Sequence, residues 1–146
     1  MEHTDQTILA LLSRDGRMSF TELGRRVGLS TSAAQQRVRR LEQRGIITGY
    51  RADVDPAQVG RGLTAIIEIQ PRGGEHDEQA PEYLASLPEI TSCYSVAGDA
   101  SYLCLAQVGS AELLDELLTR IRGDLRVTTV TTIVLRTAFK QRPLVD

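Results

Sequence analysis

Cysteine and histidine are scarce in this chain of 146 residues, which holds two of each. Cys93 and Cys104 stand in apolar stretches that favour strands, and nothing electropositive surrounds them to activate a thiol. Buried, reduced thiols are the ordinary interpretation, and a redox-active pair is the alternative. His3 and His76 lie far apart in the sequence, in an expected tail and an expected loop. No metal-ligand spacing results, so we expect neither a metal nor a cofactor.

Long apolar runs are also absent. The first run, residues 8–12, is five residues long, and the residues before it are acidic rather than basic. This pattern does not fit a secretory signal peptide. No run approaches the roughly 20 apolar residues that cross a bilayer. We therefore expect no membrane association and a cytoplasmic location.

Catalytic constellations are missing from the pattern as well. The sequence has no nucleophile next to a general base and no phosphate-binding loop. It also has no pair of carboxylates whose surroundings would give the two groups different pKa values. We therefore expect no enzyme and assign no catalytic residue. The 41% hydrophobic and 25% charged residues are ordinary for a globular protein and argue against disorder.

Charge is unevenly distributed, although the net charge is only −2. Residues 1–60 carry nine arginines and seven acidic residues, whereas residues 61–146 carry eight basic and twelve acidic residues. The excess is sharpest between Arg17 and Arg51, where there are eight arginines and two acids. The simplest interpretation is that the N-terminal part contacts a nucleic acid and the C-terminal part does not.

The basic segment has the pattern of two helices joined by a tight turn. Ser19 and Glu22 have the spacing of a capping box, in which each side chain satisfies a backbone donor of the other residue. Gly28 interrupts the first helix, and Ser30 is a natural N-cap for the second helix, which Gly45 ends.

A helix over residues 5–14 is expected to pack across these two and complete a three-helix unit. Residues 46–54 then form either a small wing or an extended connector. The positions expected to form the core of the unit are Ile8, Leu12, Leu23, Val27, Leu29, Ala34, Val38, Leu41 and Ile46.

The second helix of the pair has a polar face opposite its apolar stripe. At about 100° per residue, arginines and glutamines lie away from Ala34, Val38 and Leu41. Their forked groups match base edges, arginine with guanine and glutamine with adenine, whereas the alternative is a solvated helix face. We predict a helix-turn-helix that binds double-stranded DNA through Arg25, Arg26, Thr31, Ser32, Gln35, Gln36, Arg37, Arg39 and Arg40. Among these, the residues better placed for phosphates are Arg25, Arg26 and Arg37.

The remainder of the chain alternates strand and helix patterns. Strands are expected over 63–70, 89–97, 102–108 and 126–139, and helices over 81–87 and 110–122, the last closed by Gly123. This order is that of a ferredoxin-like βαββαβ domain. Its helices cover one face of the sheet only, so a second copy of the chain is the economical cover for an apolar second face. A dimer also suits a helix-turn-helix unit.

Three stretches of the sequence resemble the Lrp/AsnC, or feast/famine, family of transcriptional regulators. They read DGRMSFTELGRRVGLS, RVRRLEQRGIITGY and SVAGDASYLCLAQV, and the resemblance extends over essentially the whole chain. It implies an α+β fold with a helix-turn-helix (winged-helix-like) DNA-binding domain over 1–49, an extended hinge over 50–62, and a ferredoxin-like domain over 63–146. It further implies a homodimer formed through the sheets, assembly commonly to an octamer, and an amino-acid effector bound between subunits.

The resemblance also implies the residues of the effector site. These are a loop of Gly98, Asp99, Ala100, Ser101 and Tyr102, joined by Thr132, Ile133 and Val134 of a neighbouring chain. A glycine-containing turn exposes backbone N–H groups to a carboxylate, and Asp99 can meet an α-ammonium group. From the residues alone, Gly98 and Asp99 are a hairpin turn. Many members of the family carry a second acid where this chain has Ser101, so here the ammonium contact is weaker or is supplied elsewhere.

These features predict a sequence-specific transcriptional regulator that responds to an amino acid. The alternative is an architectural protein that wraps DNA with little sequence preference and uses the same residues. A redox sensor built on Cys93 and Cys104 is a third hypothesis, and it requires that a Cys→Ser substitution abolish the response.

Overall fold

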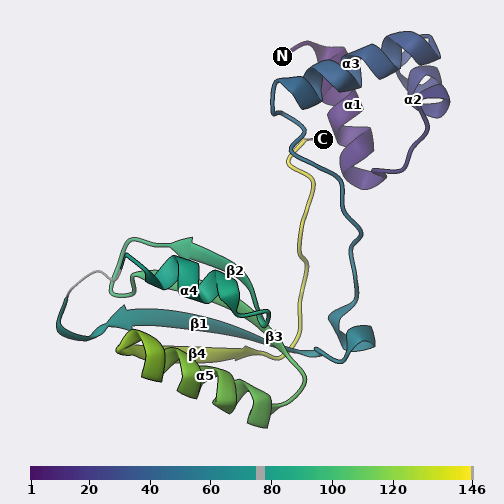
Figure 1. The fold of residues 1–146 in the computed structure, drawn as a ribbon. Helices are drawn as coiled ribbons and strands as arrows, with labels where there is room; N and C mark the ends of the chain where they lie inside the picture. The colour runs from purple at the N-terminus through teal and green to yellow at the C-terminus, as the bar shows by residue number, and fades with distance from the viewer. Residues whose placement is uncertain (75–77, 146) are drawn as a thin grey trace. The chain divides into compact units, whose positions relative to one another are not determined.

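The computed structural model describes residues 1–74 and 78–145 and divides the chain into two compact units (Figure 1). One unit is Met1–Asp53 together with Ala138–Asp146, and the other is Val54–Thr137. The C-terminal tail thus groups with the N-terminal unit, whereas the prediction assigned all residues after 62 to one domain. The predicted bounds of the DNA-binding domain, the hinge and the ferredoxin-like domain (1–49, 50–62 and 63–146) stay a prediction.

Three helices form the N-terminal unit: α1 (His3–Arg14), α2 (Phe20–Val27) and α3 (Thr31–Gln43). Both predicted N-caps are confirmed, because Ser19 Oγ accepts from the backbone N–H of Glu22 and Ser30 Oγ accepts from that of Ala33. Each such cap stabilises a helix by about 1 kcal/mol. The other predicted bond of the capping box, from the Ser19 backbone N–H to the Glu22 side chain, is wrong. The Glu22 carboxylate accepts from two arginines of its own helix instead.

Two glycines fix the turn between α2 and α3. Gly28 caps α2 in the left-handed region, at φ 71°, where a side chain is unfavourable. Gly24 lies within α2, and a Cβ atom there would stand 2.6 Å from the carbonyl oxygen of Leu29. The close approach of turn and helix therefore requires glycine at position 24.

The core of this unit agrees with the prediction. All nine predicted positions belong to it, five of them fully buried and the others partly buried. Val145 of the C-terminal tail also packs against this cluster. Residues 48–55 form no helix or strand, so of the two alternatives for this stretch the extended connector is correct. A single 3₁₀ turn, η1 (Pro56–Val59), follows it.

The second unit has the predicted ferredoxin-like order. Its elements are β1 (Leu63–Pro71), η2 (Arg72–Gly74), α4 (Ala80–Ser86), β2 (Ile90–Ser95), β3 (Tyr102–Val108), α5 (Ala111–Leu125) and β4 (Val127–Val134). The four strands form one antiparallel sheet in the order β2-β3-β1-β4. Alternate residues of β1 and β3 are buried with α4 and α5 in one core, so both helices cover the same face.

The largest errors in the predicted bounds of this unit are the ends of α5 and β4. Helix α5 continues through Gly123 to Leu125, because Leu125 extends the buried stripe of the helix, and the chain turns only at Arg126, with φ 49°. Strand β4 ends at Val134 rather than at residue 139. Val134 pairs with Thr64 at the beginning of β1, so later residues have no strand to pair with.

Candidate DNA-reading helix and effector pocket

Helix α3 separates a buried stripe from a polar face. Ala34, Val38 and Leu41 are at most 1% exposed, which fixes the rotation of the helix about its axis. On the exposed side, a shallow groove of about 330 Å³ is lined by Gln36, Arg39, Arg40 and Gln43. The structure therefore brings three of the predicted DNA-contacting residues together, and it adds Gln43 to them. Two amides and two guanidinium groups along one rigid helix suit hydrogen bonds to base edges.

The N-terminal end of α3 carries small exposed side chains. Thr31 and Ser32 are exposed, and the Thr31 hydroxyl lies 3.4 Å from that of Thr21 on α2. Gln35 is half-buried on the flank of the helix. Small residues at this end allow a close approach of the helix to another surface.

The predicted phosphate contacts on α2 form an ion-pair cluster. Glu22 accepts from Nε and Nη2 of Arg25 at 2.9 and 2.8 Å, and from Nε of Arg26 at 2.7 Å. The two hydrogen bonds from Arg25, and then the one from Arg26, lower the pKa of Glu22 to about 2. The Arg25 side chain keeps 71% of its surface exposed and that of Arg26 keeps 47%. The cluster holds both guanidinium groups in place and retains one net positive charge.

Arg37 has partners of a different kind. Its Nη1 donates to Asp5 at 2.9 Å and to Glu2 at 2.7 Å, so the residue joins α3 to the beginning of α1. These bonds, with that to Asp5 the larger cause, raise the pKa of the guanidinium group. Its side chain is only 22% exposed. The contacts give Arg37 a part in holding the three helices together.

The predicted effector loop borders a pocket on the face of the sheet that the helices leave uncovered. The pocket has a volume of about 380 Å³ and is lined by Glu68, Val96, Ala97, Asp99, Ala100 and Leu103. Two bonds anchor the loop, from the Ser101 N–H to the Ile69 carbonyl and from the Val96 N–H to the Ser101 carbonyl, at 2.9 and 3.1 Å. Gly98, at φ 134°, forms the turn.

The other predicted effector residues lie elsewhere within the chain. Tyr102 is only 7% exposed and belongs to the core beneath the helices. On β4, Thr132 pairs with Ile66 and Val134 pairs with Thr64, so both face the uncovered side of the sheet. Ile133 pairs with buried Ala65 and faces the opposite side. None of these β4 residues lines the pocket of its own chain.

Glu68 is the residue that sequence reasoning missed. It occupies the uncovered face of β1, opposite Leu103 on one side and Val130 on the other. The available signal was an acid in the middle of the apolar strand Leu63–Pro71. Only the pairing of β1 with β3, however, brings this carboxylate to the same pocket as Asp99.

Family models match both units of the chain. Residues 1–42 match the AsnC-type helix-turn-helix domain, and residues 64–145 match the Lrp/AsnC ligand binding domain. The chain belongs to the Lrp/AsnC family.

Individual relatives of this Lrp/AsnC protein agree with that assignment. The HTH-type transcriptional regulator LrpA of Mycobacterium tuberculosis is 44% identical over 97% of this chain and 95% of its own length. The leucine-responsive regulatory protein of Klebsiella pneumoniae is 39% identical over 84% of this chain and 79% of its own length. A feast or famine regulatory protein from M. tuberculosis, solved with L-methionine, is 43% identical and covers 99% of both chains at a TM-score of 0.93.

This Lrp/AsnC chain is accordingly a transcriptional regulator with a helix-turn-helix and a ligand-binding domain, and it is not an enzyme. In the described part of the chain, no helix is both long and apolar enough to span a bilayer. No three His, Cys, Asp or Glu side chains of residues 1–74 and 78–145 gather where they could hold a metal ion.

The two cysteines of this regulator lie directly opposite each other, Cys93 on β2 and Cys104 on β3. Both are free thiols, and they face the helix-covered side of the sheet. Burial, together with the neighbouring Cys93, raises the pKa of the Cys104 thiol to about 12. A thiol in that state is a poor nucleophile, which favours the structural interpretation of the pair.

Proposed function

We propose that this protein reads an operator through the exposed face of α3 and that Gln36, Arg39, Arg40 and Gln43 contact base edges. The observation that carries this proposal is the division of the helix: a fully buried stripe of Ala34, Val38 and Leu41 leaves the arginines and glutamines on the surface. Thr31 and Ser32 allow the N-terminal end of the helix to approach the groove, with Gln35 on its flank.

The arginines of α2 serve the DNA backbone in this proposal. Arg25 and Arg26 stay exposed while Glu22 fixes their positions, so they are suited to phosphates, which orient the protein without specifying a sequence. Arg37 was predicted to join them. Its two acidic partners support a structural role instead, so we leave it out of the contacts.

The effector we propose is a free amino acid, held in the pocket beside the Gly98 loop. Backbone N–H groups of the glycine-containing turn suit its carboxylate, and the two acids that line the pocket, Glu68 and Asp99, suit its ammonium group. Glu68 thereby supplies the second acid that the loop lacks at Ser101. Val96 and Leu103 offer apolar surface to a hydrophobic side chain. A relative solved with L-methionine makes methionine the first ligand to test.

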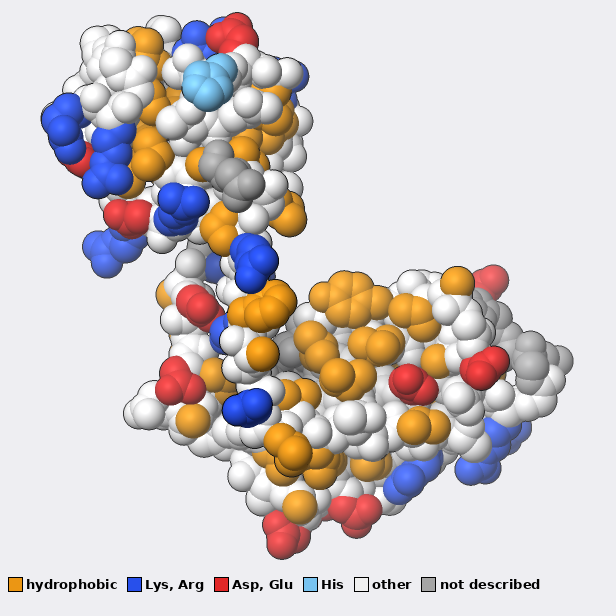
Figure 2. Space-filling view, turned by 180° about the vertical axis from the view of Figure 1, so that it is seen from behind, with side chains coloured by type: hydrophobic (Ala, Val, Ile, Leu, Met, Phe, Trp, Pro, Cys, Tyr) orange, Lys and Arg blue, Asp and Glu red, His pale blue; other side chains and the backbone are white. Residues whose placement is uncertain are grey.

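The uncovered face of the sheet supports a homodimer. Among its apolar residues, Tyr94 and Val130 keep 54% and 49% of their surface exposed, and Ile66, Leu103 and Leu105 are half-buried. Figure 2, which is turned by 180° from Figure 1, shows hydrophobic side chains gathered over the unit Val54–Thr137. We propose that a second copy covers them, that Thr132 and Val134 reach the effector from a neighbouring chain, and that dimers assemble to an octamer in the cytoplasm. Ile133 was expected to join them, but it faces the helix-covered side of the sheet, so we leave it out.

A thermal-shift screen over the twenty amino acids tests the effector, because a ligand at 100 times its dissociation constant adds about 2.7 kcal/mol to the folded state. Binding to a genomic fragment library in the presence of random competitor DNA tests the operator. Selective recovery of particular sequences supports the regulator. Equal recovery of all fragments would instead favour the architectural protein that wraps DNA with little preference.

A further inference from the structure

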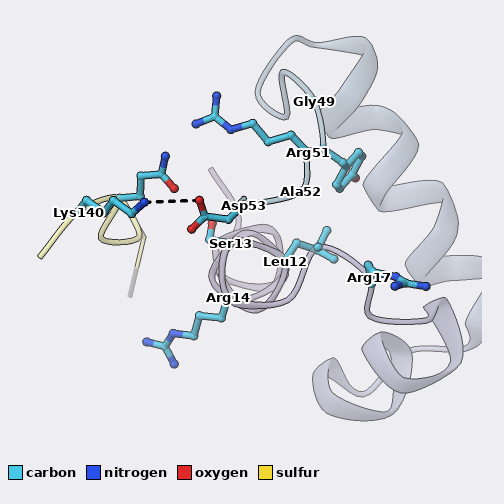
Figure 3. Close-up of a pocket in the computed structure, with 12 residues that line it drawn as sticks. Leu12, Ser13, Arg14, Arg17, Gly49, Arg51, Ala52, Asp53 and Lys140 are labelled. Carbon is cyan, nitrogen blue, oxygen red and sulfur yellow. Dashed lines mark ion pairs between the residues drawn. The ribbon is translucent and has the colours of Figure 1, made fainter. Parts of the chain in front are cut away.

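The N-terminal unit has a second concentration of basic residues, distinct from the groove of α3. A pocket of about 720 Å³ is lined by the end of α1, residues 49–53, and residues 140–141 of the C-terminal tail (Figure 3). Its charged lining residues are Arg14, Arg17, Arg51 and Lys140, with Asp53 the one acid. Three segments that are distant in sequence thus contribute cations to one cavity.

The cations of this pocket are poorly neutralised. Lys140 Nζ lies 3.7 Å from Asp53 Oδ1, which is at the long end for an ion pair, and both side chains are more than half exposed. Among the described residues, Arg14 and Arg51 form no ion pair, and both extend toward the side of the pocket where Lys140 lies (Figure 3). Arg17 points to the other side. Three cations therefore share this side of the pocket with one carboxylate.

We propose that this pocket binds backbone phosphates of the DNA that flanks the segment read by α3. The inference rests on the proposed function, because it requires the N-terminal unit to lie on DNA. A hydrogen bond joins the pocket to the reading helix: Tyr50 lines the pocket, and its hydroxyl donates to Glu42 near the end of α3 at 2.9 Å. The guanidinium groups of Arg14 and Arg51 in this open hollow suit phosphate oxygens, which need charge and donors rather than a shaped apolar cavity.

The experiment measures the affinity of the full chain for its operator as a function of salt. Each phosphate contact contributes a slope of about −0.9 to the logarithm of the association constant against the logarithm of salt. The triple variant Arg14→Gln, Arg51→Gln, Lys140→Gln should therefore flatten the slope by about 1 to 3 per chain. Arg72→Gln, an exposed arginine of the other unit, is the matched control and should leave the slope unchanged.

A gain-of-function variant separates the proposal from damage to the fold. Asp53→Asn removes the one acid of the pocket and releases Lys140 from its ion pair. We expect it to tighten operator binding by about 3- to 10-fold at low salt and to steepen the salt slope. Both effects should disappear on a duplex trimmed to the bases that α3 reads. If Asp53→Asn and the triple variant both bind the long duplex as the wild type does, the proposal is wrong.

A third arm separates DNA from a free phosphorylated ligand. Inorganic tripolyphosphate is titrated into the protein in a thermal-shift assay. Stabilisation that the triple variant loses, without any change in DNA affinity, would assign the pocket to a small anion and overturn the proposal. A wild type that binds no DNA at all would refute the proposed function itself, whereas unchanged variants of a DNA-binding wild type would refute only this inference.

Discussion

Arg37 on the recognition helix donates hydrogen bonds to Asp5 and Glu2 at the beginning of α1, whereas Arg40, three residues later, is exposed and lines the groove of the reading face. The same residue type in one helix is thus used in two ways. The side facing α1 supplies a link within the unit, and the other side leaves its charge free for a partner.

This difference predicts that one substitution lowers stability and the other weakens DNA binding. Arg37→Ala should lower the melting temperature by a few degrees, because it leaves Asp5, which is only 13% exposed, without its partner. Arg40→Ala should leave the melting temperature unchanged and weaken DNA binding. Thermal unfolding and operator titration of both variants check the prediction, and an Arg37→Ala variant with wild-type stability would contradict it.

Base reading by Gln36 is the second prediction. Gln36→Ala should cost about 1–3 kcal/mol of binding to the preferred operator and relax the base preference at one position, because a bidentate amide contact is lost. Arg25→Ala should weaken binding to all sequences alike and flatten the salt dependence. Selection from a randomised operator library distinguishes them. An unchanged base preference in Gln36→Ala would exclude this residue from reading.

The third prediction concerns the two acids of the effector pocket. Glu68→Gln and Asp99→Asn should each weaken binding of the effector by about 10- to 100-fold, because each removes a charged acceptor for the ammonium group. Calorimetry with L-methionine, or with the ligand that the screen identifies, measures the loss.

Two controls accompany these variants. Glu82→Gln changes an exposed acid on α4, on the covered side of the sheet, and should bind as the wild type does. An N-acetylated ligand lacks the ammonium group and should not bind the wild type. Equal affinity for free and acetylated ligand would show that neither acid meets an ammonium group.

Dimer formation through the sheet gives the fourth prediction. Leu105→Glu places a charge in the middle of the uncovered face and should weaken self-association at least about 100-fold, because the interface would bury an unpaired carboxylate. Leu113→Glu, at a position 48% exposed on α5, is the matched control on the opposite side. Sedimentation velocity compares the two. A Leu105→Glu protein that still forms the wild-type assembly places the interface elsewhere.

The fifth prediction concerns the thiols. With the pKa of Cys104 raised to about 12, less than about one thiol in a thousand is ionised at pH 8, so iodoacetamide should not alkylate this residue in the folded protein. Unfolding in urea should lower the pKa toward its ordinary value and restore the reaction. Cys93→Ser should leave DNA binding and the effector response unchanged. Loss of the response in that variant would revive the redox-sensor hypothesis.

Local sequence patterns were sufficient to predict the helices and strands and the exposed face of α3. The caps at Ser19 and Ser30, the stripe of Ala34, Val38 and Leu41, and the order of strands and helices follow from interactions within a few residues of one another. Helical periodicity then determines which side chains of α3 face outward. Each of these features depends on residues that are near one another in the sequence.

Only the tertiary structure decided which distant residues meet. The register of β1 against β3 brings Glu68 to the pocket of Asp99, and strand alternation turns Ile133 away from Thr132 and Val134. The return of the tail brings Lys140 to Asp53 and Val145 to the helical core. Such pairings depend on which segments pack together in three dimensions, and the spacing of residues along one segment carries no information about its partner. Sequence therefore determined the parts of this regulator, and packing determined which charges act together.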